Sequence, residues 1–227
     1  MFEQYKQGLI DGIPIALGYV SVSFTFGMMA VSYGMDVWFA VVISLLNLTS
    51  AGQFSGLTLM VEQASLMELA LSQFIINLRY ALMSLSLTQK IESKTSTFHR
   101  AIMSFAITDE IFAMAASKPH KVNQIYFYGL MTLPIIGWTL GTLFGGVAYS
   151  LLPQSIQTAL GIAIYGMFIA IIIPPAKASK NVLFVVLIGA LVSCILTYFK
   201  VSSGFSVIIC AFIAAGLGAF LFPMKED

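Results

Sequence analysis

The stretch NLTSAGQFSG at residues 47–56 interrupts a run of apolar residues, 37–60, near its middle. Glycine destabilises a helix interior, and Ser, Thr and Asn side chains offer the backbone alternative hydrogen bonds. The composition therefore predicts a helix that breaks within the run; the alternative is a continuous helix whose small residues only pack. A break would present a helix N-terminus near Gly52 and Gln53, and its partial positive charge suits an anion such as a carboxylate.

The rest of the chain is as apolar as this run. Of the 227 residues, 59% are hydrophobic and 9% are charged, and the mean hydropathy is +0.92. A soluble domain carries about 25% charged residues, so lipid must surround most of this chain. We predict an all-α integral membrane protein, a single polytopic transporter domain over residues 1–227 with about seven to eight hydrophobic helical segments. Eight runs are long enough to cross a bilayer: 13–34, 37–60, 66–89, 98–117, 124–151, 155–173, 181–199 and 203–222.

The positions of lysine and arginine leave two topologies open. The hinges 90–100 and 118–121 are basic, and they fall on opposite faces if every run crosses the membrane fully. Basic hinges favour the cytoplasmic face. In the alternative topology, 37–60 and 98–117 therefore enter and leave by the same side, as broken or re-entrant segments.

Polar residues form one face of the run 66–89. Gln73, Asn77 and Tyr80 are spaced by four and by three residues, which places them on the same side of a helix. Arg79 points away from that side and lies too far from both ends of the run to reach water easily. We expect Arg79 either to pair with an acid on a neighbouring helix or to contact a substrate.

Two adjacent acids, Asp109 and Glu110, lie inside the run 98–117. Ionisable residues within a membrane are costly and face a cavity or a partner. Neighbouring residues on a helix diverge by about 100°, so the two carboxylates face different surroundings. One can neutralise Arg79 while the other binds a substrate ammonium group or carries a proton, and the sequence does not assign the two roles.

These polar positions in an apolar chain indicate a membrane transporter; the alternatives are a channel, a non-transporting assembly subunit and an enzyme. A channel for a small neutral solute would usually show a repeated filter motif, and a non-transporting assembly subunit would use its small residues to contact a partner. An enzyme is not expected, because the sequence contains neither a His-Glu-x-x-His nor a Gly-x-Ser-x-Gly motif. No cofactor, metal or nucleic acid is predicted, the last because the net charge is only +1.

The chain resembles the AzlC family, the azaleucine-resistance type of branched-chain amino-acid permease. The resemblance spans nearly the whole chain and is carried by the opening at 12–27, SAGQF at 50–54, NLRY at 77–80 and TDE at 108–110. Two departures stand out. Family members commonly show an Ala-Gly-Ala-Ser-Gln-Phe pattern near residue 50, and many have histidine where this chain has Tyr80.

The resemblance implies a permease in the bacterial cytoplasmic membrane that exports valine, leucine and isoleucine, with methionine as a further candidate. It also implies coupling to an ion gradient and a small membrane partner subunit of the AzlD type. Together with the polar residues described above, the resemblance leads to one hypothesis for how a zwitterionic substrate is bound. The region of Gly52 and Gln53 and the face of Gln73 and Asn77 bind its carboxylate and amine, and Asp109 or Glu110 supplies the ammonium contact or the coupling proton.

Overall fold

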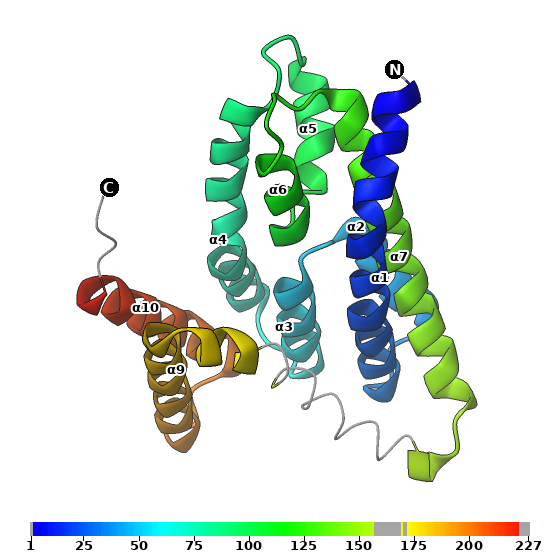
Figure 1. Ribbon diagram of the computed structural model, residues 1–227. Coiled ribbons are helices and arrows are strands. Elements are labelled where there is room, and N and C mark those ends of the chain that lie inside the picture. Colours follow the sequence, from blue (N-terminus) through cyan, green and yellow to red (C-terminus); the bar gives the residue numbers. More distant parts are fainter. Residues whose placement is uncertain (1, 157–168, 170–171, 223–227) are drawn as a thin grey trace. The chain divides into compact units, whose positions relative to one another are not determined.

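The computed structural model describes residues 2–156, 169 and 172–222, and within them every regular element is a helix (Figure 1). One isolated bridge joins Ile91 to Val122. The helices are α1 (Phe2–Ser32), α2 (Val37–Leu46), α3 (Ser50–Val61), α4 (Leu66–Lys90), α5 (Thr97–Phe105), α6 (Asp109–Ala116), α7 (Gln124–Leu151), α9 (Lys180–Tyr198) and α10 (Ser203–Leu221).

Four of these helices, α1, α7, α9 and α10, are long and apolar enough to cross a membrane. Helix α4 is also long, with 25 residues, but it is interrupted by polar and charged side chains. The runs 37–60 and 98–117 each form two short helices, and most of 155–173 lies outside the described residues. The prediction of an all-α fold is therefore confirmed for the described residues, and the prediction of about seven to eight hydrophobic helical segments is not.

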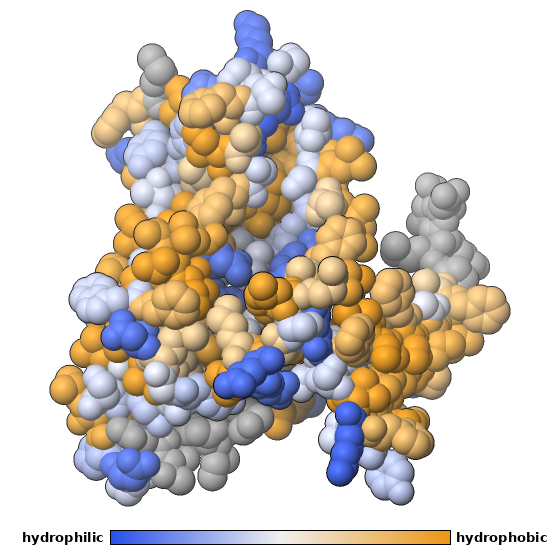
Figure 2. Space-filling view, turned by 180° about the vertical axis from the view of Figure 1, so that it is seen from behind, coloured by the Kyte–Doolittle hydropathy of each residue, from blue (hydrophilic) through white to orange (hydrophobic). Residues whose placement is uncertain are grey.

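Large apolar side chains cover the outside of these helices. Leu17, Leu82, Leu187 and Phe212 are each more than half exposed, and Figure 2 shows hydrophobic side chains over much of the visible face. A water-soluble domain rarely exposes so much contiguous apolar surface. The surface therefore suits a lipid environment.

The chain divides into two compact units. Unit 1 comprises residues 1–54 and 77–157, and unit 2 comprises residues 55–76 and 158–227. Helices α3 and α4 each contribute to both units. The prediction of one polytopic domain stays a prediction.

Unit 1 is built on two long helices, α1 and α7, which lie side by side and run in the same direction (Figure 1). Glycines allow their backbones to touch. A Cβ atom on Gly12, Gly137 or Gly141 would lie only 2.7, 2.8 or 2.6 Å from a carbonyl oxygen of the other helix. Small residues are the usual means of close helix packing in membranes.

This contact gives a prediction for stability. We expect Gly141→Ala to destabilise unit 1 by about 1–3 kcal/mol, the usual cost of overpacking a tight contact. Thermal unfolding in detergent measures the change. Gly18→Ala is the matched control, because Gly18 lies on α1 with nothing within 4 Å of its Cβ position. An equal change in the two variants would contradict the prediction.

The break predicted in 47–56 is confirmed, and it lies at residues 47–49. Helix α2 starts at the Asp36 N-cap and ends at Asn47, whose backbone is extended, and α3 begins at Ser50. The Asn47 side chain accepts a hydrogen bond of 2.9 Å from the backbone N–H of Thr49, so it satisfies one of the groups that the break exposes.

The second broken segment, α5 and α6, forms a hairpin whose two ends lie together. Val122 donates a backbone hydrogen bond of 2.9 Å to Lys90, and Glu92 donates one of 3.0 Å to Val122. The basic hinges 90–100 and 118–121 therefore lie at the same end of unit 1. The two ends of the segment 98–117 thus lie together, as the alternative topology requires of this segment, and its position relative to a membrane stays a prediction. At about 1.5 Å per residue, neither helix could cross a bilayer.

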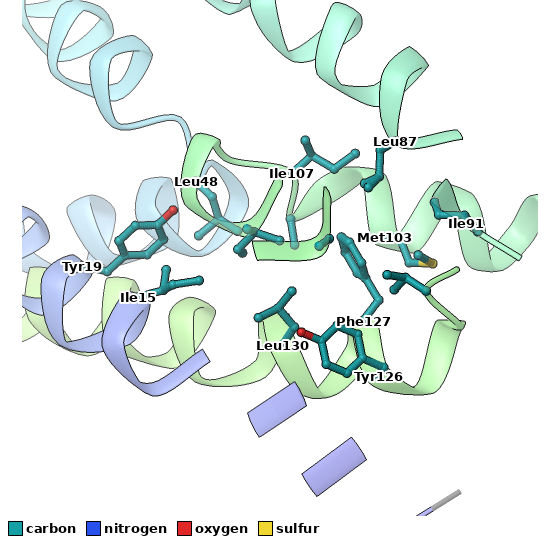
Figure 3. Packing of buried hydrophobic residues seen from close by; sticks show 14 of the residues in the cluster. Ile15, Tyr19, Leu48, Leu87, Ile91, Met103, Ile107, Tyr126, Phe127 and Leu130 are labelled. Atoms are coloured by element: carbon teal, nitrogen blue, oxygen red, sulfur yellow. The ribbon is translucent and has the colours of Figure 1, made fainter. Parts of the chain in front are cut away.

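Buried apolar residues fill unit 1 from this end to its middle. Figure 3 shows Leu87, Ile91 and Met103 toward one end of the cluster and Tyr19 and Leu48 toward the other. The two helix breaks meet near the Tyr19 end: Tyr19 stacks edge-on against Trp138 at 5.2 Å and contacts Thr108 beside the second break.

Unit 2 contains the hairpin of α9 and α10, which packs on the start of α4. The carboxylate of Glu68 accepts backbone hydrogen bonds from Gly204, at 3.0 Å, and Phe205, at 3.3 Å, and it also bonds the Ser202 hydroxyl. A carboxylate at a helix N-terminus satisfies N–H groups and opposes the helix dipole. Glu68 therefore fixes the start of α10 to α4.

Candidate functional site

A cavity of about 220 Å³ lies inside unit 1, where the two helix breaks meet. We call it the unit 1 cavity. Its apolar wall is formed by Pro14, Ile15, Val22, Leu48 and Trp138, together with Gly18. Its polar wall is formed by Tyr19, Ser50, Arg79, Tyr80, Thr108, Asp109 and Glu110.

Two helices begin at this cavity. Ser50 starts α3, and Thr108 is the N-cap of α6, with its side-chain oxygen accepting from the N–H of Ile111. The first turn of a helix carries N–H groups without intrahelical partners and a partial positive charge. In α6, this charge is met by Asp109 and Glu110 in the first turn, whereas the first turn of α3 contains no acid. The α3 end is therefore the better position for an anionic group.

Arg79 and Asp109 form an ion pair across the cavity wall, with 2.7 Å between Nη1 and Oδ2. The guanidinium also donates to the Tyr80 hydroxyl at 3.2 Å and lies 5.0 Å from the centre of that ring. The side chains of Arg79 and Asp109 are 46% and 48% exposed, so the pair faces open space on one side. The structure thus assigns the neutralising role to Asp109.

Glu110 has a different environment. Its Oε2 lies 2.6 Å from the hydroxyl of Tyr19, which is also 2.5 Å from Oγ1 of Thr108. A phenol has one proton and can donate to only one of these groups at a time; the carboxylate is the stronger acceptor. The hydroxyl of Tyr19 therefore holds Glu110 in place where it lines the cavity.

Gln53 is buried, and its amide contacts protein groups. It donates to Ser44 Oγ at 2.5 Å and accepts from Nε1 of Trp138 at 2.9 Å. Ser44 is in turn 2.7 Å from the hydroxyl of Thr142 on α7. Gln53 thus fixes the start of α3 against α2 and α7 and does not line the unit 1 cavity.

Only some of the other predicted site residues line the unit 1 cavity. Arg79, Asp109 and Glu110 come together at the cavity, whereas Gly52, Gln73 and Asn77 are not among its lining residues. Gln73 belongs to unit 2, where its side chain packs on Gly56, and Asn77 belongs to unit 1. The predicted polar face of α4 is therefore shared between the two units.

Sequence reasoning missed Tyr19 and Trp138. Both line the cavity, and both contact a helix break through partners at least 85 residues away in the sequence. No local motif marks such contacts. The one usable signal was in α1, where Ile15, Tyr19 and Ser23 recur every four residues and are all buried.

An all-helical chain with broken helices around a charged cavity and a lipid-compatible surface is a polytopic membrane protein. The family model described as "AzlC protein" matches residues 14–152, a range that contains every residue lining the unit 1 cavity. The chain belongs to the AzlC family.

Relatives of the chain are also membrane proteins by name. The chain is 30% identical to an uncharacterized membrane protein of Archaeoglobus fulgidus over 175 residues, which is 76% of each chain. It is 26% identical to the inner membrane protein YgaZ of Escherichia coli over 225 residues, 95% of this chain and 91% of the relative. An uncharacterized membrane protein of Helicobacter pylori is 32% identical over 149 residues, 64% of each chain. No solved structure matches.

Proposed function

We propose that this protein is a transporter subunit that moves branched-chain amino acids, namely valine, leucine and isoleucine with methionine as a further candidate, across the bacterial cytoplasmic membrane. One observation carries the proposal: the unit 1 cavity sets a carboxylate and a positive helix end beside an apolar wall. A small zwitterion with an apolar side chain has the complementary groups. The AzlC resemblance supports the same substrate class.

The charges of the cavity define how such a substrate binds. Arg79 is matched by Asp109, which leaves the carboxylate of Glu110 as an excess negative charge. The substrate ammonium group contacts Glu110, and its carboxylate lies at the N-terminus of α3 beside Ser50. The side chain packs against the apolar wall, which contains Val22 and Leu48.

Glu110 is also the candidate for coupling transport to a proton gradient. A carboxylate that alternates between a substrate ammonium group and a proton links the movement of the two. The hydroxyl of Tyr19 holds the carboxylate in both forms, because it can donate to the charged group and accept from the neutral one.

The basic residues orient unit 1 in the membrane. Lys90, Lys94, Lys118 and Lys121 lie in the two hinges joined at Val122, and Lys6 lies at the start of α1, which packs beside the start of α7. We call this the basic end of unit 1. By the positive-inside rule, the basic end faces the cytoplasm.

A small membrane subunit of the AzlD type completes the proposed transporter. This partner rests on the resemblance, so it is tested directly by measuring flux with and without it.

The proposal is tested by efflux of labelled valine, leucine, isoleucine and methionine from cells that express the chain alone or with an AzlD-type subunit. We expect efflux that saturates, that responds to an imposed pH gradient, and that is slowed by competing leucine but not by lysine or glutamate. Flux that rises linearly with concentration would favour a channel for small neutral solutes. No flux in either combination would leave a membrane protein that does not transport these amino acids.

A further inference from the structure

A second ion pair in unit 1 lies outside the cavity, between Asp11 on α1 and Lys118 just after α6. The Lys118 Nζ atom is 2.6 Å from Asp11 Oδ2. The Tyr126 hydroxyl donates to the same oxygen at 2.6 Å, and Gln7 donates to Oδ1 at 3.0 Å. The side chains of Asp11 and Lys118 are 14% and 29% exposed, so this pair is more deeply buried than the pair of Arg79 and Asp109.

Helix α6 lies alongside α1 between two polar contacts. Near the cavity Glu110 bonds Tyr19, and toward the basic end Lys118 bonds Asp11. The two contacts are eight residues apart in each segment, which on α1 corresponds to about 12 Å at 1.5 Å per residue, and α6 runs antiparallel to α1. Ile15 and Ile111 belong to the buried cluster that fills this interval.

These contacts make the α5–α6 hairpin one wall between the cavity and the basic end. Its connection to α4 at Val122 consists of two backbone hydrogen bonds beside a chain hinge. At this end its polar contact with α1 is the ion pair of Lys118 with Asp11. Its contacts with α7 are the 2.5 Å contact of His99 Nδ1 with the Tyr128 hydroxyl and the packing of its buried apolar residues in the cluster.

We infer that Asp11, Lys118 and Tyr126 form a latch that keeps the α5–α6 hairpin closed over the basic end of the unit 1 cavity. The inference rests on the proposed function, because a transporter must open its site to each side in turn. Release of the latch opens the cavity toward the basic end, while the contacts of Glu110 with Tyr19 and of Arg79 with Asp109 belong to the substrate site.

The latch is tested by the access of a water-soluble reagent, without any substrate. Val22, which lines the cavity, is changed to cysteine in a Cys194→Ser/Cys210→Ser background. A membrane-impermeant maleimide is then applied from either side of membrane vesicles. We expect Asp11→Asn and Lys118→Met to increase labelling from the basic side about tenfold, as a change of about 1.4 kcal/mol in the opening equilibrium would give.

Matched variants separate a latch from a general loss of structure. Lys118→Arg keeps the charge and should label like the parent, and Tyr126→Phe should give an intermediate rate. Lys121→Met removes a neighbouring exposed lysine and should change nothing. Thermal unfolding in detergent is measured for each variant. If Asp11→Asn does not fold, the labelling rate of Lys118→Met tests the latch.

Unchanged labelling in the folded Lys118→Met variant would overturn the latch, as would an equal increase in Lys121→Met. The result is independent of the transported molecule. If labelling rises as expected in a protein without amino-acid flux, the latch stands and the proposed substrate is wrong. If flux is found and labelling does not change, the latch alone is wrong.

Discussion

In the Glu110→Gln variant we expect amino-acid flux to fall at least about tenfold, because a hydrogen bond to a charged group contributes about 1.5–3 kcal/mol. The glutamine oxygen can still accept the hydrogen bond that Tyr19 makes at 2.6 Å, so the wall of the cavity keeps its shape. What is lost is the negative charge that faces the substrate ammonium group and the group that would carry a proton. Initial rates of valine efflux measure the effect.

Two variants control this experiment. Glu62→Gln neutralises an exposed acid in the hinge after α3 and should transport normally. Tyr19→Phe keeps Glu110 charged but removes the hydroxyl that positions it, so we expect a smaller loss of flux and an altered pH dependence. Normal flux in Glu110→Gln would remove this carboxylate from the mechanism.

The second large effect is expected for the pair of Arg79 and Asp109. Breaking a fully buried ion pair by removing one partner costs about 3–5 kcal/mol. Because these side chains are about half exposed, we expect about 1–3 kcal/mol for Arg79→Gln or Asp109→Asn. In the double variant neither charge is left unmatched, so most of the lost stability should return. Thermal unfolding in detergent measures all three variants.

The same variants distinguish a structural pair from a substrate contact. If the pair only holds the cavity wall together, the double variant recovers flux along with stability. A double variant that is stable but inactive would place Arg79 or Asp109 in direct contact with the substrate. A double variant as unstable as either single one would contradict the pairing.

The break in 47–56 could be predicted because its cause is local. Several residues that weaken a helix follow one another there, and the extended backbone at Asn47 shows the result. The second break had a weaker local signal. Thr108 followed by Asp109 and Glu110 is a typical helix start, but the charge positions of the hinges, rather than this motif, suggested that the segment returns.

The composition of the cavity was only partly predictable. Helical periodicity correctly separated Arg79 from Asn77, but it grouped Tyr80 with Gln73 and Asn77, whereas the cavity is lined by Arg79 and Tyr80. Periodicity defines which residues share a face and not which neighbour that face meets. The position of Gln53 has the same explanation. Its amide was expected to contact the substrate, but its oxygen accepts a hydrogen bond from Trp138 on α7, a neighbour that periodicity does not reveal.

The parallel contact of α1 and α7 also has a mechanical consequence. The two backbones touch from Gly8 beside Tyr126 to Gly27 beside Thr142. Sliding one helix past the other would therefore press carbonyl groups against the facing backbone, and dense packing transmits such strain. We therefore expect α1 and α7 to move together as one rigid unit. In the proposed transport cycle, we expect deformation to be taken up by the short helices rather than by this pair.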